Sequence, residues 1–245
     1  MGVSVLTREV QVGHGIRFAT TGRPGGVSIA PYASLNLGGK VGDDSAAVDR
    51  NRAVLAEAVG VAPDRLVVMA QMHSADVALV WETPASPLQV DAMVTDVADL
   101  ALVAMGADCA PVMVADAEGG GLIGVAHCGR PGLGNGVLDA LVGALRDLGA
   151  RALVGRVGPA ICGHCYEVPH ALHDEIAARV PAASARTRWG TPGLDIGVGA
   201  LAELERLGVV AERLGGCTYE DRAAYSYRRD GRTGRLAGIA WRSAV

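Results

Sequence analysis

The sequence has few aromatic residues, which make up 4% of its 245 residues and include a single Phe. Its core must therefore be built from Val, Leu, Ile and Ala. The chain also lacks an excess of basic residues, because its net charge is −4. Nucleic-acid binding needs a basic patch or stripe, so it is disfavoured. No apolar run approaches the ~20 residues that span a bilayer, which excludes a membrane helix.

The N-terminal segment lacks the apolar core of a secretory signal, since Arg8 and Glu9 bring charge into it. The five cysteines are an odd number. We therefore expect a reduced, cytoplasmic setting in which the thiols bind metal or pack. The length allows one large domain or two small ones. Because no linker divides the sequence, we expect one domain over residues 1–245.

Apolar periodicity and punctuation predict four helices and a larger number of short strands. The helices are expected at 46–58, capped by Asp44 or Ser45 and ended by Gly60, and at 137–148, 169–180 and 196–207, the last capped by Asp195. The strands are expected at 66–70, 77–80, 92–94, 100–105, 112–115, 122–126, 154–157 and 236–241. Strands cluster in the middle of the chain, which favours an α+β sandwich over regular βαβ alternation.

Two histidines and a cysteine stand close to the ends of predicted strands. His73 lies in QMHSAD, Cys109 in GADCAP and His127 in VAHCG. One thiolate and two imidazoles form a borderline-soft ligand set that suits zinc, and three ligands leave a coordination position open for catalysis. The alternative is two hydrogen-bonded histidines and a buried free thiol.

Polar residues surround these three candidates. Gln71, Ser74 and Asp76 flank His73, and Asp108 precedes Cys109. A carboxylate beside a metal-binding histidine can orient its ring. The glycine-rich segment CGRPGLGNG follows His127 and precedes a predicted helix, whose first amides can hold an anion. A simple turn is the alternative for that segment.

Two further motifs are open to competing interpretations. Cys162 and Cys165 form a CxxC, but a redox pair needs a helix N-terminus and a structural zinc site needs a second pair, and the sequence offers neither nearby. The Arg-rich segment 225–235 has the composition of a phosphate site, although a charged hairpin turn is the more common structure. Arg52, on the first helix, is within reach of an anion if it points inward.

Taken in order, the motifs resemble those of the laccase-domain, or multicopper polyphenol oxidase-like, family, whose members are purine nucleoside phosphorylases or peptidoglycan editing factors. The resemblance covers nearly the whole chain. It rests on GGVSIAPYASLNLGGKVGDD, QMHSADV, DAMVTD, ADCAPVMVAD, GVAHCGRPGLGNGVL, GPAICGHCYEV, LDI and YSYRRDGRTGRLAGIA. It implies one catalytic domain, a sandwich of mixed β-sheets flanked by helices.

The resemblance also implies roles for particular residues. His73, Cys109 and His127 occupy metal-ligand positions, and the metal is expected to be Zn²⁺. Arg52 is expected to hold phosphate or substrate. The resemblance implies that Asn36 in SLNL lines the pocket, and Gln71 and Ser74, the polar neighbours of His73, are also expected to bind substrate. The family usually has HAGWRG where this chain has HCGRPG, so the tryptophan is missing and a thiol, Cys128, follows the third ligand.

The expected reaction is phosphorolysis of adenosine or inosine to the free base and ribose 1-phosphate. Methylthioadenosine phosphorolysis and adenosine deamination are expected as related activities, the latter because zinc activates water for attack on adenine C6. Asp91 and Asp108 are the candidate acid–base residues, and Arg52 is expected to assist catalysis by holding phosphate. The expected partners are small molecules, a purine nucleoside and phosphate, rather than nucleic acid or membrane.

Other functions fit some of the same residues. Cys109 and His127 also suit a cysteine hydrolase, as nucleophile and base. A non-catalytic role in cell-wall editing is a further alternative. A copper oxidase needs several histidine-rich copper sites, which six scattered histidines do not supply.

Overall fold

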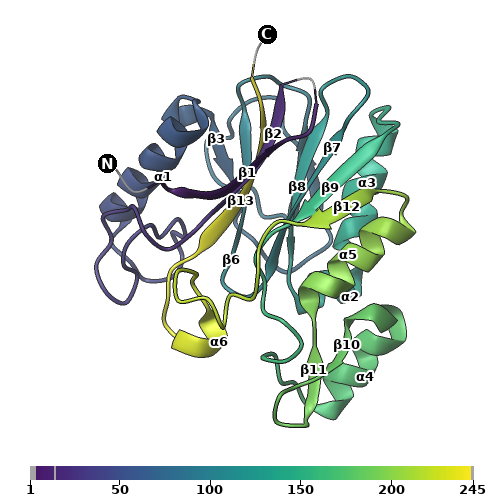
Figure 1. Cartoon of the computed structure of the whole chain (residues 1–245). Coiled ribbons are helices and arrows are strands. Elements are labelled where there is room, and N and C mark those ends of the chain that lie inside the picture. Colours follow the sequence, from purple (N-terminus) through teal and green to yellow (C-terminus); the bar gives the residue numbers. More distant parts are fainter. Residues whose placement is uncertain (1–3, 14, 244–245) are drawn as a thin grey trace.

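Two β-sheets pack face to face in the computed structural model, which describes residues 4–13 and 15–243 (Figure 1). The first sheet has the order β1 (Leu6–Gln11), β2 (Ile16–Thr21), β13 (Leu236–Arg242), β6 (Ala101–Gly106) and β3 (Leu66–Val68). The second has the order β12 (Val210–Arg213), β9 (Leu153–Val157), β7 (Ala110–Asp116), β8 (Ile123–Cys128), β5 (Ala92–Thr95) and β4 (Val77–Leu79). Both sheets mix parallel and antiparallel pairs.

Helices cover the outer face of each sheet, which makes four layers. Helix α1 (Ser45–Val59) packs on the first sheet, and α3 (Val137–Asp147) and α5 (Ile196–Arg206) pack on the second. Helix α4 (His170–Arg179) lies beside the hairpin of β10 (Ser184–Arg186) and β11 (Pro192–Leu194). Two short helices complete the chain, α2 (Arg130–Asn135) and α6 (Tyr227–Asp230). The expected α+β sandwich of mixed sheets is confirmed.

Alternation along the strands separates three apolar layers. In β6, Leu102 and Ala104 face the second sheet, whereas Ala101 and Val103 face α1. Phe18, the single phenylalanine, is fully buried between the sheets. A core of small aliphatic residues therefore fills the sandwich, as the composition predicts.

Helix caps follow the residues that the sequence marks. Asp44 accepts a hydrogen bond from the Ala46 amide at the start of α1, and Gly60 ends that helix with a φ of 76°. Asp195 caps α5 through the Val198 amide. The predicted helices and strands are all present, with ends shifted by a few residues. Among the described residues, no helix is both long and apolar enough to cross a membrane.

Several short or exposed elements of the fold are not predicted from the sequence, and one prediction is wrong. Strands β1 and β2 were not predicted, because charged residues interrupt their apolar pattern and β1 is a largely exposed edge. The short strands β10 to β12 also went unpredicted. The expected hairpin turn at 225–235 is wrong: the segment forms the single-turn helix α6, where the Ser226 side chain accepts a hydrogen bond from the Arg229 amide.

Candidate metal centre

The strand register brings His73, Cys109 and His127 to one end of the sandwich. Strands β3 and β6 run parallel, so the loop with His73 and the β6–β7 turn with Cys109 leave the same edge. Strand β8 is antiparallel to β7 and pairs His127 with Pro111, two residues after Cys109. One ligand atom from each of the three residues lies within 4.8 Å of the others.

The geometry of the triad suits a metal ion. Cys109 Sγ lies 4.0 Å from His73 Nε2. The two imidazole rings are 4.7 Å apart between centroids and inclined by 77°. His73 and Asp108 both have left-handed backbone, with φ values of 62° and 105°. Strained conformations of this kind cluster at functional sites, and here they turn two loops toward the same point.

Hydrogen bonds to Asp91 hold two of the three candidate ligands, His127 and the loop that carries His73, in position. Its Oδ1 accepts a hydrogen bond of 2.8 Å from His127 Nδ1, which leaves Nε2 as that ring's free nitrogen. Its Oδ2 accepts from the amides of Met72 and Ser74, on either side of His73, at 2.9 and 2.7 Å. Asp91 is fully buried. This fits the second-layer carboxylate that fixes a metal-binding histidine, rather than an acid–base group facing substrate.

The charges at the triad depend on one another. Burial alone raises the pKa of the Cys109 thiol, but the His127 and His73 imidazoles lower it to about 6. Burial lowers the pKa of His127, but Cys109 and Asp91 raise it to about 9. Hydrogen bonds from His127 and two backbone amides hold the pKa of Asp91 well below its usual range despite burial. The triad thus favours a positive charge between a thiolate and a carboxylate, which suits a cation.

Gly129 leaves room for the ligands. A Cβ atom at this position would lie 2.8 Å from Cys109 Sγ and 3.1 Å from His73 Cδ2. The backbone there has a φ of −88°, which any residue adopts, so the need for glycine is steric. The donor set and this clearance both fit a metal ion held by His73, Cys109 and His127.

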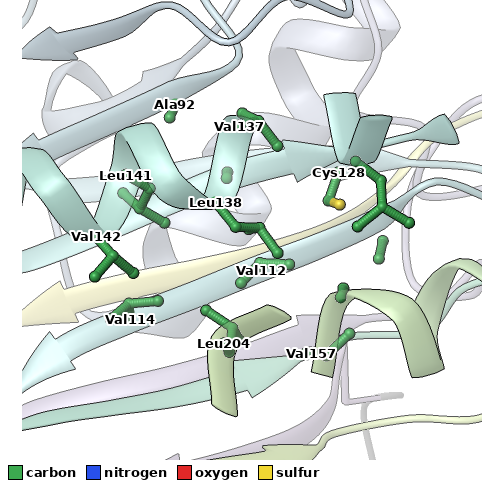
Figure 2. Packing of buried hydrophobic residues seen from close by; sticks show 14 of the residues in the cluster. Ala92, Val112, Val114, Cys128, Val137, Leu138, Leu141, Val142, Val157 and Leu204 are labelled. Atoms are coloured by element: carbon green, nitrogen blue, oxygen red, sulfur yellow. The ribbon is translucent and has the colours of Figure 1, made fainter. Parts of the chain in front are cut away.

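Cys128 is not part of the site. Neighbouring residues of a strand face opposite sides, so His127 faces the pocket end of the sandwich while Cys128 faces the helices. Figure 2 shows Cys128 as part of the buried aliphatic cluster that also contains Leu138 and Val157. Burial raises the pKa of this thiol, which keeps it protonated. The additional thiol that the sequence places beside the third ligand is a core residue.

A pocket of about 800 Å³ opens beside the triad. Of the substrate and acid–base candidates from the sequence, Arg52, Gln71 and Asp108 line it. Arg52 donates two hydrogen bonds to the Leu37 carbonyl. Gln71 is tied to the Met105 backbone by two hydrogen bonds. These contacts fix both side chains in the pocket wall.

Asn36 and Ser74 lie outside the pocket lining. Asn36 is fully buried, and its Oδ1 accepts from the amides of Gly38 and Arg235, both from lining residues. Ser74 Oγ accepts from the Asp76 amide. The structure thus places these two residues where they support the loops around the site.

Several cationic residues of the pocket wall were not picked out individually from the sequence. They are Lys40, Arg130, Arg228 and Arg235. Arg130 begins α2 in the glycine-rich segment that was expected to hold an anion, and Arg228 and Arg235 come from the Arg-rich segment 225–235. Arg228 also lies 4.7 Å from the centre of the Tyr166 ring. Composition pointed to these segments, but only the fold shows that they converge.

Asp108 links this wall to the triad. Its carboxylate accepts hydrogen bonds from Thr218 Oγ1 at 2.7 Å and from the Arg228 amide at 2.6 Å. Burial raises its pKa, although these hydrogen bonds oppose the shift. Asp108 is therefore the acidic residue that faces the pocket with a raised pKa.

Comparison with known proteins identifies the family of the chain and agrees with its fold. Residues 17–243 match the model of the family described as multi-copper polyphenol oxidoreductase laccase. The chain is 51% identical to a purine nucleoside phosphorylase of Streptomyces coelicolor, over 93% of this chain and 96% of the relative. It is 43% identical to one of Corynebacterium glutamicum, over 92% and 94%.

Solved structures show the same architecture. A protein of Neisseria meningitidis superposes with a TM-score of 0.86 at 32% identity, over 98% of this chain and 100% of that one. A protein of Geobacillus stearothermophilus gives a TM-score of 0.85 at 29% identity, over 99% and 100%. The chain belongs to the multi-copper polyphenol oxidoreductase laccase family, which confirms the resemblance seen in its motifs.

Replacing Asp91 by Asn is expected to weaken metal binding by about 10- to 100-fold, as for other residues that orient metal ligands. The amide cannot accept from His127 and from both loop amides at once. Chelator competition on the purified protein measures the affinity. Asp76→Asn removes an exposed carboxylate from the same loop and serves as the control. Equal affinity for the Asp91 variant and the wild type would show that Asp91 does not hold the ligands.

Replacing Gly129 by Ala is expected to reduce metal affinity by about tenfold or more, because the added methyl group crowds Cys109 and His73. The backbone conformation tolerates alanine, so the melting temperature of the metal-free protein should change little. Gly143→Ala, on α3 with open space around it, is the matched control. A variant that binds metal as tightly as the wild type would contradict the crowding.

Metal affinity should rise with pH. Between about pH 6 and 9 the metal-free triad holds a proton on His127 that metal must displace, so affinity should increase about tenfold per pH unit. Below about pH 6 the Cys109 thiol also becomes protonated, and the dependence should steepen. Above about pH 9 it should level off. Titrations in metal-buffered solutions test this, and a flat profile between pH 6 and 9 would contradict the coupled charges.

Proposed function

We propose that the chain is a zinc-dependent purine nucleoside phosphorylase that converts adenosine or inosine and phosphate to the free base and ribose 1-phosphate. One observation carries the proposal: a single pocket joins a three-ligand metal centre to a wall of arginines. The names of the curated relatives support the same reaction.

The donor set favours zinc as the metal. A thiolate and two imidazoles are borderline-soft ligands, and three of them leave one position of a tetrahedral ion open. When bound, zinc would supply a Lewis acid at this end of the pocket. His73, Cys109 and His127 would hold the ion, and Asp91 would keep the His127 ring in the correct orientation.

The arginines suit phosphate. Burial lowers the pKa of Arg52 and of Arg235, so an anion that enters the pocket offsets the cost of keeping these groups charged. Neither forms an ion pair with a carboxylate within the part of the chain that the structure describes. Arg52 uses two of its five N–H groups on Leu37, and the others are available to phosphate oxygens.

The remaining wall suits a nucleoside. Val68, Met105, Ile161 and Tyr166 give it an apolar and partly aromatic surface. Gln71 provides an amide close to the triad. A volume of about 800 Å³ lies within the range of pockets that enclose small molecules and accommodates a nucleoside with phosphate.

In the proposed reaction a phosphate oxygen forms a bond to C1′ of the ribose as the bond from C1′ to N9 of the purine breaks. The bonding electron pair leaves with the purine, which takes up a proton. Asp108 is the proposed proton donor, because burial raises its pKa and it faces the pocket. Arg52 and its neighbours hold the anionic nucleophile beside the positive charge that develops on the ribose.

We also propose that methylthioadenosine phosphorolysis and adenosine deamination occur at the same site. Both substrates share the adenosine framework, and the open coordination position suits activation of water for deamination.

We also propose that the protein works in the cytoplasm, because all five of its cysteines are free and the reducing cytoplasm keeps thiols free.

Incubation of the zinc-loaded protein with adenosine should give adenine and ribose 1-phosphate only when phosphate is present. Arg52→Ala should lower kcat/KM for phosphate by about 10- to 100-fold, the effect of losing one or two charge-assisted hydrogen bonds. Arg151→Ala, an exposed arginine away from the pocket, should leave it unchanged. Chromatography with mass detection measures the products.

Different outcomes would favour different functions. Adenine release without phosphate would indicate a hydrolase. Activity that survives complete metal removal but not Cys109→Ala would indicate a cysteine nucleophile. Copper in place of zinc in the active protein would contradict the choice of metal.

A further inference from the structure

A second cluster of metal-binding side chains lies outside the triad. Sγ atoms of Cys162, Cys165 and Cys217 and a carboxylate oxygen of Glu220 all lie within 4.8 Å of one another. The sequence shows a CxxC without a nearby partner pair, which argued against a structural zinc site. The fold supplies the partner, because Cys217 and Glu220 come from a loop more than fifty residues further along the chain.

Both pairs have the same spacing. Two residues separate Cys162 from Cys165, and two separate Cys217 from Glu220. Each pair lies on a tight turn: the Cys165 amide donates to the Cys162 carbonyl at 3.0 Å, and the Asp221 amide donates to the Cys217 carbonyl at 3.0 Å. Two such turns facing each other are the usual construction of a structural zinc site.

The backbone joins the two turns into one unit. Ala160 and Cys217 form a parallel bridge, and the Thr218 amide donates to the Ala160 carbonyl at 3.2 Å. The Cys162 amide points at Cys217 Sγ, 3.4 Å away. An amide directed at sulfur stabilises a thiolate. The fold therefore holds the donors together before any metal binds.

We propose that Cys162, Cys165, Cys217 and Glu220 bind a structural zinc ion, separate from the catalytic metal. Three thiolates and a carboxylate form a closed set of four ligands, which suits a structural rather than a catalytic ion. The cluster has one thiol too many for a single disulfide, and Cys162 does not begin a helix as a redox CxxC requires.

Arg188 is the competing occupant. Its Nη2 lies 2.6 Å from Cys165 Sγ and 2.5 Å from Glu220 Oε1, so a cationic group already approaches the cluster. The side chain is exposed and can move to the solvent. The position of Arg188 shows that the cluster attracts positive charge. In the proposed site the zinc ion replaces the Arg188 guanidinium at Cys165, and Glu220 can contact both the zinc ion and Arg188.

The site supports the wall of the substrate pocket. Ile161 and Tyr166, which bracket the first turn, both line the pocket. The Ile161 amide donates to the Asp108 carbonyl, and Thr218, next to Cys217, donates to the Asp108 carboxylate. An ion that fixes the two turns therefore also fixes Asp108. The proposal does not depend on which reaction the pocket catalyses.

Metal content of the full chain, purified under reducing conditions after growth with zinc, tests the proposal. The wild type should carry two zinc ions per chain, and Cys109→Ala should keep one. Cys109→Ala combined with Cys217→Ser should carry none. The proposal would be overturned if the wild type carried a single ion and the Cys109→Ala variant carried none. A disulfide among Cys162, Cys165 and Cys217 in protein purified under these reducing conditions would also overturn it.

Milder variants keep the test valid if Cys217→Ser does not fold. In the Cys109→Ala background, the exposed substitution Glu220→Ala should speed zinc loss to a chelator at least tenfold, whereas Glu205→Ala on α5 should not. Arg188→Ala should not speed that loss.

Cobalt added to metal-free Cys109→Ala should give absorption bands from thiolate-to-cobalt charge transfer and the intense visible bands of tetrahedral coordination. Absence of these bands would contradict the ligand set.

Discussion

The hydrogen bonds of the buried Asp91 carboxylate are the interactions on which the candidate metal centre depends. Asp91 precedes β5, accepts a hydrogen bond from the His127 ring, and binds the two amides that flank His73. One residue of the second sheet thereby fixes a ligand on the neighbouring strand and a loop that leaves the first sheet. Because both sheets contribute, the ligands converge only when the sandwich is fully packed, and metal binding is expected to stabilise the packed state over the unfolded chain.

The pocket separates two regions of opposite charge. The triad places a thiolate next to a histidine that is hydrogen-bonded to a buried carboxylate, which suits a cation, and the same pocket is lined by arginines, of which Arg52 and Arg235 are buried in a way that suits an anion. The proposed transfer of ribose to phosphate requires that a cation and an anion bind in one pocket. Asp108 lies between the two regions, and its carboxylate contacts the turn that carries Cys217. The proposed structural zinc ion therefore supports, through Asp108, the wall of the pocket that contains the proposed catalytic zinc ion.

The sequence predicts the helices and strands of the layers well. It predicts poorly which side chains from distant segments meet in the pocket and in the cysteine cluster. Local signals such as the Asp44 and Gly60 caps identify α1, and short apolar runs identify the buried strands. Strands β1 and β2 lack such a signal because their pattern is broken by charge. Motif order predicts the three ligand positions, but the role of Cys128 depends on the strand face that it occupies, and the role of Asp91 depends on the packing of two loops and a strand around it. The second cysteine cluster joins turns far apart in sequence, which no local pattern reveals.

We propose that His73, Cys109 and His127 hold one metal ion and that the Asp91 carboxylate keeps the His127 ring in place. Diffraction data from crystals of the zinc-loaded protein, collected on both sides of the zinc absorption edge, test it most directly. An anomalous peak within bonding distance of Cys109 Sγ and of His73 and His127 ring nitrogens, with Asp91 still bound to His127 Nδ1, is the predicted result. Absence of a peak there in crystals of the catalytically active protein would contradict it.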